Sequence, residues 1–106
     1  MLLDTSGLLC YLDNREERHQ DALACFTSAS HRVTHNYVLA ELVALCLARR
    51  IQRTIALEFA SYFSHTSFVE VIWVDEALHR RAVALLEARL VKEWSLCDAV
   101  SFVLME

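Results

Sequence analysis

The stretch Met1-Leu2-Leu3-Asp4-Thr5-Ser6-Gly7 decides the fold, because it places a buried strand at the head of the chain. Three apolar residues stop at four polar or small ones, a pattern that predicts a short strand followed at once by a helix. Thr5 or Ser6 is expected to cap that helix. The carboxylate of Asp4 would then emerge where the strand ends, which makes it a candidate for either a helix cap or a functional site.

Two more candidate strands follow, Arg32-Val33-Thr34 and Phe68 to Val74, of which the second alternates and is rich in β-branched and aromatic residues. Helical spacing of apolar residues recurs between and after them. Six helices are expected. The first carries Leu8 to Leu12, and the second runs from the charged Asp13–Arg18 segment to about Phe26. The third spans Tyr37 to Arg50, the fourth contains Ala56 to Phe63, the fifth follows Asp75, and the sixth runs from Ser95 to Glu106.

The expected order is therefore a strand and two helices, repeated three times. This order predicts an α/β fold with a three-stranded parallel sheet and helices on both faces. Ligands of such sheets bind beyond the carboxyl ends of the strands, where Asp4 lies.

Composition favours a single helix-rich domain over residues 1–106, because 56% of the residues are hydrophobic and the chain has one Gly and no Pro. No apolar run approaches the roughly 18 residues of a membrane span, and no basic segment precedes an apolar one, so we expect a cytoplasmic protein. The absence of a C-x-x-C pair and the apolar neighbours of each cysteine predict free, buried thiols at all four, namely Cys10, Cys25, Cys46 and Cys97.

The net charge of −4 gives no general attraction for nucleic acid, although Arg49, Arg50 and Arg53 form a local basic cluster. The five histidines lack zinc-site spacing and are expected at the surface. Trp73 and Trp94 are expected in or beside the core. No glycine-rich phosphate loop occurs.

Three acids in apolar surroundings are candidates for one site: Asp4, Glu41 and Asp98. Glu41 is the only charged residue between Tyr37 and Ala48, where a carboxylate is costly unless it faces solvent, a cation or a polar cleft. Asp98 follows Ser95 at the spacing of a capping box, so a structural role is the alternative for it. As a set, the three carboxylates suit Mg²⁺ or Mn²⁺, whose charge would offset their repulsion. Such a site can activate water for in-line attack on a phosphodiester.

Four fragments, in this order, resemble the PIN domain family and in particular the VapC-type toxins of bacterial toxin–antitoxin pairs. They are Leu3-Asp4-Thr5-Ser6, the segment Thr34 to Leu42, the strand Val69 to Asp75, and Leu96 to Phe102. The resemblance runs from Met1 to Glu106. It implies a three-layer α/β/α PIN-like fold and a ribonuclease that cleaves RNA internally.

The resemblance also implies a Mg²⁺- or Mn²⁺-dependent site in which Asp4, Glu41 and Asp98 are both metal ligands and catalytic residues. Thr5, Ser6 and Asn36 would help to position the water or the metal. Family members often form homodimers, and a cognate antitoxin holds such toxins inactive. An RNA substrate, an antitoxin and a second copy of the chain are therefore the expected partners.

The match to the family has one gap. PIN domains usually supply a fourth acid and two more strands that complete a five-stranded sheet, and Glu106 does not match that acid. We therefore expect a PIN-like domain over residues 1–106 that lacks the last strands of the family, with an open sheet edge at Met1 to Asp4 that attracts another chain. The alternative function is a non-catalytic PIN-like module that acts through protein–protein contacts.

Overall fold

The structure is a computed structural model that describes residues 1–106. Its elements follow the expected order apart from the expected first strand, which is not among them: α1 (Thr5–Leu12), α2 (His19–Ser28), β1 (Val33–His35), α3 (Asn36–Ala48), α4 (Arg53–His65), β2 (Glu70–Ile72), α5 (Glu76–Ala88) and α6 (Leu96–Met105). None of these helices combines the length and the apolar content that crossing a bilayer requires.

The sheet is parallel, as predicted, but smaller than predicted. β1 and β2 pair with Val33 opposite Glu70. The N-terminal segment adds a single parallel bridge, Leu2 to Val33, in which the Leu3 N–H donates to the Val33 carbonyl at 2.7 Å. The expected first strand is reduced to this bridge because Asp4 already begins the cap of α1. The sheet therefore has two strands, with the N-terminal segment along one edge.

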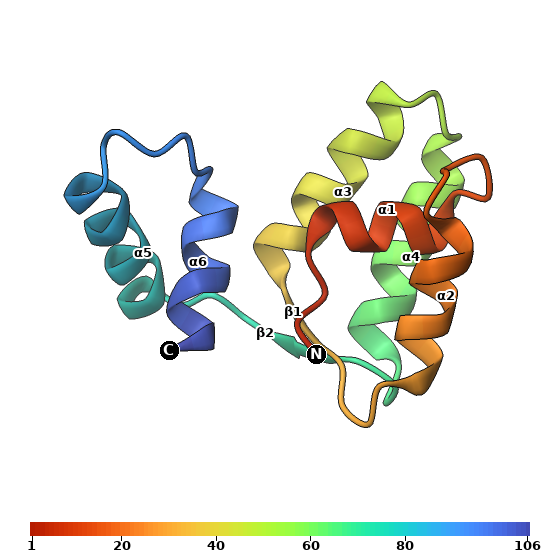
Figure 1. The fold of residues 1–106 in the computed structure, drawn as a ribbon, viewed down its shortest axis with the longest axis horizontal. Helices are drawn as coiled ribbons and strands as arrows, with labels where there is room; N and C mark the ends of the chain where they lie inside the picture. The colour runs from red at the N-terminus through yellow and green to blue at the C-terminus, as the bar shows by residue number, and fades with distance from the viewer.

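Apolar side chains gather in two separate cores. The larger core of 12 buried residues includes Leu3, Leu8, Val38, Leu42 and Phe63; it lies among α1 to α4 and the sheet, and α6 contributes Cys97 to it. The smaller one, Ala82, Ala99 and Val100, lies between α5 and α6. Figure 1 shows the consequence: α5 and α6 form a lobe on one side of the sheet, and α1 to α4 form the other lobe.

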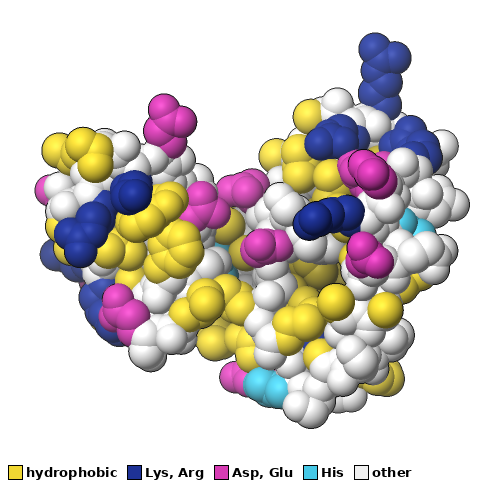
Figure 2. All heavy atoms as spheres, viewed as in Figure 1, with side chains coloured by type: hydrophobic (Ala, Val, Ile, Leu, Met, Phe, Trp, Pro, Cys, Tyr) yellow, Lys and Arg dark blue, Asp and Glu magenta, His cyan; other side chains and the backbone are white.

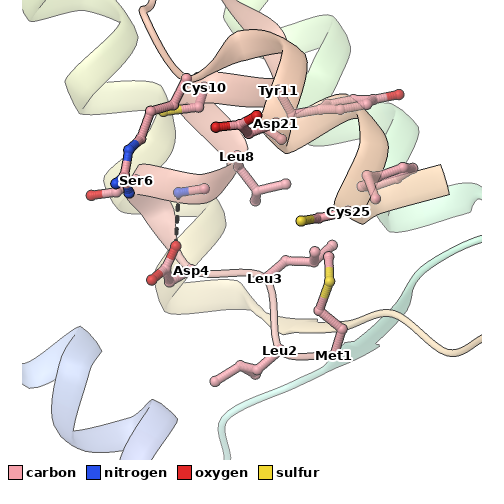
Figure 3. A pocket seen from close by; sticks show the side chains of 14 residues that line it. Met1, Leu2, Leu3, Asp4, Ser6, Leu8, Cys10, Tyr11, Asp21 and Cys25 are labelled. Carbon is pink, nitrogen blue, oxygen red and sulfur yellow. Dashed lines mark hydrogen bonds between the residues drawn. The ribbon is translucent and has the colours of Figure 1, made fainter. Parts of the chain in front are cut away.

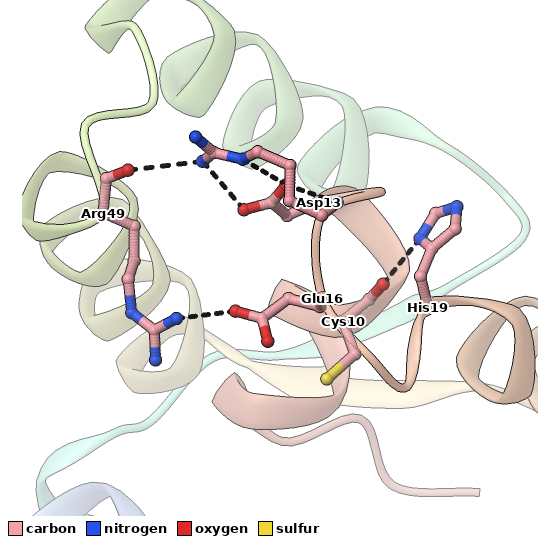
Figure 4. A network of polar contacts seen from close by, with 6 residues as sticks. Cys10, Asp13, Glu16, His19 and Arg49 are labelled. Carbon is pink, nitrogen blue, oxygen red and sulfur yellow. Dashed lines mark hydrogen bonds and ion pairs between the residues drawn. The ribbon is translucent and has the colours of Figure 1, made fainter.

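A polar network fastens the loop after α1 to the end of α3 (Figure 4). The Arg15 guanidinium donates to both carboxylate oxygens of Asp13 at 2.9 Å, which holds the pKa of Asp13 below its usual value. Arg15 also donates to the Arg49 carbonyl at 3.3 Å, and Arg49 pairs with Glu16 at 2.6 Å. These bonds fix α1 against α3, and two of the candidate acids lie at α1 and on α3.

The cysteine, tryptophan and histidine side chains lie partly where they were expected and partly elsewhere. All four cysteines are free, as predicted, but only Cys46 and Cys97 are buried; the expected burial is wrong for Cys10, which is half-buried, and for Cys25, which is exposed. Trp73 is 63% exposed, so its expected place in the core is wrong: it follows the end of β2, beyond the cover of the helices. Trp94 packs edge-on against Phe102 at 4.8 Å between ring centroids. The expectation of surface histidines is wrong for His35, which is fully buried.

Candidate active site

Asp4 is the N-cap of α1, and one of its oxygens, Oδ1, accepts a hydrogen bond from the Gly7 N–H at 2.7 Å (Figure 3). The expected caps, Thr5 and Ser6, are therefore wrong; Thr5 instead becomes the first, buried residue of the helix. A Cβ atom on Gly7 would lie 2.9 Å from Asp4 Oδ1, so the single glycine of the chain lets this carboxylate close over the helix end. Asp4 Oδ2 has no hydrogen-bond partner within the chain and remains available.

Asp98 completes a capping box at the start of α6, as the spacing from Ser95 predicted. The Ser95 hydroxyl oxygen accepts from the Asp98 N–H at 3.0 Å, and Asp98 Oδ2 accepts from the Ser95 N–H at 3.1 Å. Asp98 is exposed, and its second oxygen, Oδ1, has no hydrogen-bond partner within the chain. The cap occupies one oxygen and leaves the other free.

Glu41 lies on an exposed face of α3, and none of the ion pairs in the structure includes it. Its neighbour across the helix interface is the thiol of Cys97. Burial raises the pKa of Cys97 to about 12; the negative charges of Glu41 and Asp98 add to the rise, and a hydrogen bond with Thr5 opposes it. Glu41 and Asp98 thus act on one thiol from two different helices.

The contact between Thr5 and Cys97 marks where α1, α3 and α6 meet. Thr5 Oγ1 lies 4.0 Å from Cys97 Sγ, and both residues are buried. Asp4 precedes Thr5 and Asp98 follows Cys97, while Glu41 approaches the same thiol from α3. Figure 2 shows acidic side chains on both sides of the notch between the lobes. Asp4 and Asp98 therefore adjoin the two residues of this contact, and the charge of Glu41 acts on the same thiol.

These residues suit a hard divalent cation by their chemistry. All three are exposed carboxylates, no Lys or Arg pairs with any of them, and each has at least one oxygen to offer. Their side chains do not close around a point, however: no group of three His, Cys, Asp or Glu residues in the structure could hold a metal ion as placed.

A pocket of about 500 Å³ opens beside Asp4, between the N-terminal segment and helices α1 and α2 (Figure 3). Its wall is mainly apolar, with Leu3, Leu8 and Tyr11 among the lining residues. Ser6 and Arg18 also line it, and both are exposed. The pocket therefore offers a hydroxyl and a guanidinium next to the Asp4 carboxylate.

Of the three residues predicted to support the acids, Thr5 and Ser6 lie beside the site. Thr5 faces Cys97 beneath the acids, and Ser6 faces outward next to Asp4. Asn36 has a different partner: its Oδ1 accepts from the Val74 N–H at 2.6 Å and so ties α3 to the segment after β2.

Two residues of this region were missed in the sequence. Cys97 was interpreted only as a free thiol, although its place directly before Asp98 is the signal that it lies beneath the site. His35 was expected at the surface, but it is buried, and as the N-cap of α3 its Nδ1 accepts from the Val38 N–H.

A model of the PIN domain family matches residues 1–106. The chain belongs to the PIN domain family. Among solved structures, the crystal structure of VapC20 from Mycobacterium tuberculosis, described as a toxin that cleaves the sarcin–ricin loop, is similar with a TM-score of 0.89 and 28% sequence identity. The match covers 98% of this chain and 79% of the VapC20 chain. No curated protein sequence matches. The PIN domain assignment confirms the fold class predicted from the sequence.

Proposed function

We propose that this PIN domain is a metal-dependent endoribonuclease and the toxin of a toxin–antitoxin pair. The observation that carries the proposal is the contact between Thr5 and Cys97, because Asp4 adjoins Thr5, Asp98 adjoins Cys97, and the charge of Glu41 on α3 raises the pKa of the same thiol. The likeness to VapC20, a toxin that cleaves the sarcin–ricin loop, supports RNA as the substrate class.

Mg²⁺ or Mn²⁺ would be held by the oxygens that the helix caps leave free, Asp4 Oδ2 and Asp98 Oδ1, together with the carboxylate of Glu41. When bound, such a cation activates a water molecule and stabilises the charge that develops on a phosphate. The helix ends do the rest: the N-termini of α1 and α6 hold two carboxylates at fixed positions and favour their negative charge. Glu41 caps no helix and forms no ion pair, so both of its carboxylate oxygens are free for the metal.

RNA phosphates would approach the site from the side of Ser6 and Arg18. The Ser6 hydroxyl and the Arg18 guanidinium line the pocket that begins at Asp4, and both can donate hydrogen bonds to phosphate oxygens. The apolar wall beside them can hold a base or sugar. In this arrangement the three carboxylates bind the metal, and Ser6 and Arg18 in the adjoining pocket bind the phosphates of the RNA.

We also expect the chain to act in the cytoplasm as a homodimer or other homo-oligomer, and a cognate antitoxin to bind it. Exposed apolar side chains near the site are consistent with protein partners: Phe102 on α6 is 38% exposed and Met105 is 69% exposed. The antitoxin would block the reaction if it covered the notch between the lobes.

A second candidate is a non-catalytic PIN-like module. One observation favours it: Asp4 and Asp98 both serve as helix caps, and no three side chains close into a metal site. The module would then use the same surfaces for protein contacts alone.

Melting curves with and without Mn²⁺ separate the two functions when Asp4→Asn is compared with the unsubstituted chain. Asparagine keeps an oxygen for the Gly7 N–H, so the variant retains its cap and loses only the charge. The nuclease requires that Mn²⁺ raises the melting temperature of the unsubstituted chain alone, and that cleavage of single-stranded RNA disappears in the variant. Stabilisation without cleavage supports the module. If Mn²⁺ neither stabilises the chain nor supports cleavage, the proposed function is wrong.

A further inference from the structure

Three consecutive residues, His35, Asn36 and Tyr37, join the two lobes of the molecule. His35 Nε2 lies 2.9 Å from Ser101 Oγ on α6, and Asn36 Oδ1 accepts from the Val74 N–H at 2.6 Å. The Tyr37 hydroxyl hydrogen-bonds His79 on α5. These bonds add polar contacts to the apolar ones between the lobes, in which Cys97 joins the larger core and Tyr37 packs against the smaller one.

The hydrogen bond between His35 and Ser101 is the buried one of the three, and the other contacts of the two residues determine which atom is the donor. His35 is fully buried, and its Nδ1 accepts from the Val38 N–H at 3.4 Å, so Nδ1 carries no proton. Burial lowers the pKa of His35 to about 4, which keeps the ring neutral at pH 7. The proton is therefore on Nε2, which donates to Ser101 Oγ. The Ser101 hydroxyl in turn donates to the Cys97 carbonyl at 3.3 Å.

This relay connects the two helices that carry opposing acids. His35 is the N-cap of α3, which carries Glu41, and Ser101 lies one helical turn after Asp98 on α6. A change in the bond between His35 and Ser101 would shift α6 along or around α3, and Asp98 would move with it. Apolar packing also joins α3 to α6, because Cys97 belongs to the core that holds Val38 and Leu42 of α3. Such packing has no preferred direction, whereas the hydrogen bond between His35 and Ser101 ties one position of α6 to the start of α3.

We propose that His35 is a positioning residue that holds Asp98 opposite Glu41 by donating a hydrogen bond to Ser101. The inference rests on the proposed nuclease function and assigns to it a residue outside the set of acids. His35 touches neither metal nor RNA in this account. It acts through Ser101 and the first turns of α6.

Two substitutions separate the two bonds that His35 makes. His35→Asn places an oxygen where Nδ1 lies, so it keeps the cap for the Val38 N–H and loses the hydrogen bond to Ser101. His35→Gln places an amide nitrogen near the position of Nε2, so it keeps the hydrogen bond to Ser101 and weakens the cap. Ser101→Ala removes the same hydrogen bond by deleting its acceptor. Asp75→Ala is the matched control, because Asp75 caps α5 through the Leu78 N–H at 2.8 Å and makes no bridge to α3.

Across these variants, activity and Mn²⁺ binding are expected to depend on whether the hydrogen bond between His35 and Ser101 is kept, and not on the melting temperature. His35→Asn and Ser101→Ala should each lower kcat on the order of tenfold or more and remove most of the Mn²⁺-induced rise in melting temperature, because a misplaced ligand cannot close the site. The double variant should be no worse than either single one. His35→Gln and Asp75→Ala should melt earlier and keep most of their activity.

Hydrogen exchange of the α6 amides, measured without metal, tests the bridge independently of catalysis. His35→Asn should accelerate exchange in α6 with little change in α4, and His35→Gln should not. Equal losses of activity in the Asn and Gln variants, or a loss in Asp75→Ala as large as that in His35→Asn, would overturn the inference. If the unsubstituted chain is inert toward Mn²⁺ and RNA, the proposed function fails, and the exchange of α6 alone decides whether the bridge exists.

Discussion

Asp4 and Asp98 each divide their two carboxylate oxygens between a helix end and the candidate site. One oxygen accepts a backbone N–H, at 2.7 Å for Asp4 and 3.1 Å for Asp98, and the other is free. Capping and metal binding are therefore compatible roles for one side chain. The cap also fixes the rotamer, so the free oxygen is presented at a defined place.

The double role of Asp98 predicts a clear separation of stability from activity. Asp98→Asn keeps an acceptor for the Ser95 N–H and should change the free energy of unfolding little, while Mn²⁺ binding and RNA cleavage are lost. Asp98→Ala removes the cap as well and should cost about 1 kcal/mol. Urea unfolding and RNA cleavage, measured on both variants, check this. An active Asp98→Asn variant would remove Asp98 from the site.

The buried His35 predicts a loss of stability in mild acid. Its pKa is about 4 in the folded chain and about 6.5 in an unfolded one, so the unfolded chain binds more protons between these values. The free energy of unfolding should therefore fall as the pH falls from 6.5 to 4, by up to the order of 3 kcal/mol, and this contribution should not change further below pH 4.

Urea titrations at several pH values measure this effect, and His35→Gln is the reference because it cannot titrate. The difference between the two proteins in how the free energy of unfolding depends on pH gives the contribution of His35 alone. The contribution of Asp13, whose pKa is lowered by hydrogen bonds from Arg15, is the same in both and cancels. Parallel pH profiles for the two proteins would show that His35 is not buried as described.

At the level of elements, the chain leaves the end of α3 through a residue with an unfavourable backbone conformation. Arg50 has a φ of 61°, in the left-handed region that favours glycine, and the Ile51 N–H donates to the Cys46 carbonyl at 2.9 Å beyond it. Arg50 is exposed and adjoins Arg49 and Arg53, the basic cluster. A cationic side chain is thus present where a glycine would fold more easily.

This conformation predicts that Arg50→Gly stabilises the chain by about 0.5 to 1 kcal/mol, because the strain of a left-handed residue is relieved. Arg50→Ala removes the same charge and keeps the strain, so it is the matched control and should not stabilise. Urea unfolding measures both. If the basic cluster binds RNA, both variants should bind single-stranded RNA more weakly at low salt.

The helices could be predicted from the sequence because their signals are local. Asp75 caps α5 and Ser95 caps α6 as their spacing indicated, and periodic apolar residues mark α4. The first strand was overestimated both in length and in burial: one bridge places Met1 to Leu3 on the sheet edge, and only Leu3 of the three is buried, while Met1 is 47% exposed. Which residue caps α1 was also undecidable locally, since Asp4, Thr5 and Ser6 can all cap a helix.

At the scale of the whole molecule, the two lobes make the chain more extended than a typical domain. Its radius of gyration is 14.1 Å, against about 13 Å for a compact domain of this length. The sequence indicates that three acids belong to one site, but the offset between α3 and α6 depends on His35, whose buried bond to Ser101 spans 66 positions. No local pattern reveals such a pair.

The open sheet edge predicts association of the chain. The N–H and C=O groups of Leu2 have no backbone partner, and the pocket of about 500 Å³ adjoins them. Such an edge pairs readily with another strand. Light scattering should show a dimer or larger species that Leu2→Lys shifts toward monomer, because a charged side chain opposes edge pairing. A stable monomer of the unsubstituted chain at all concentrations would contradict the prediction.

The most direct test of the central claim, that three carboxylates from separate helices act together, is metal-dependent RNA cleavage by Glu41→Gln. Glu41 caps no helix and forms no ion pair, so this substitution leaves the fold intact. The account predicts that Mn²⁺-dependent cleavage of single-stranded RNA falls by about a hundredfold or more, while the melting temperature without metal stays the same. Cleavage at the rate of the unsubstituted chain would contradict it.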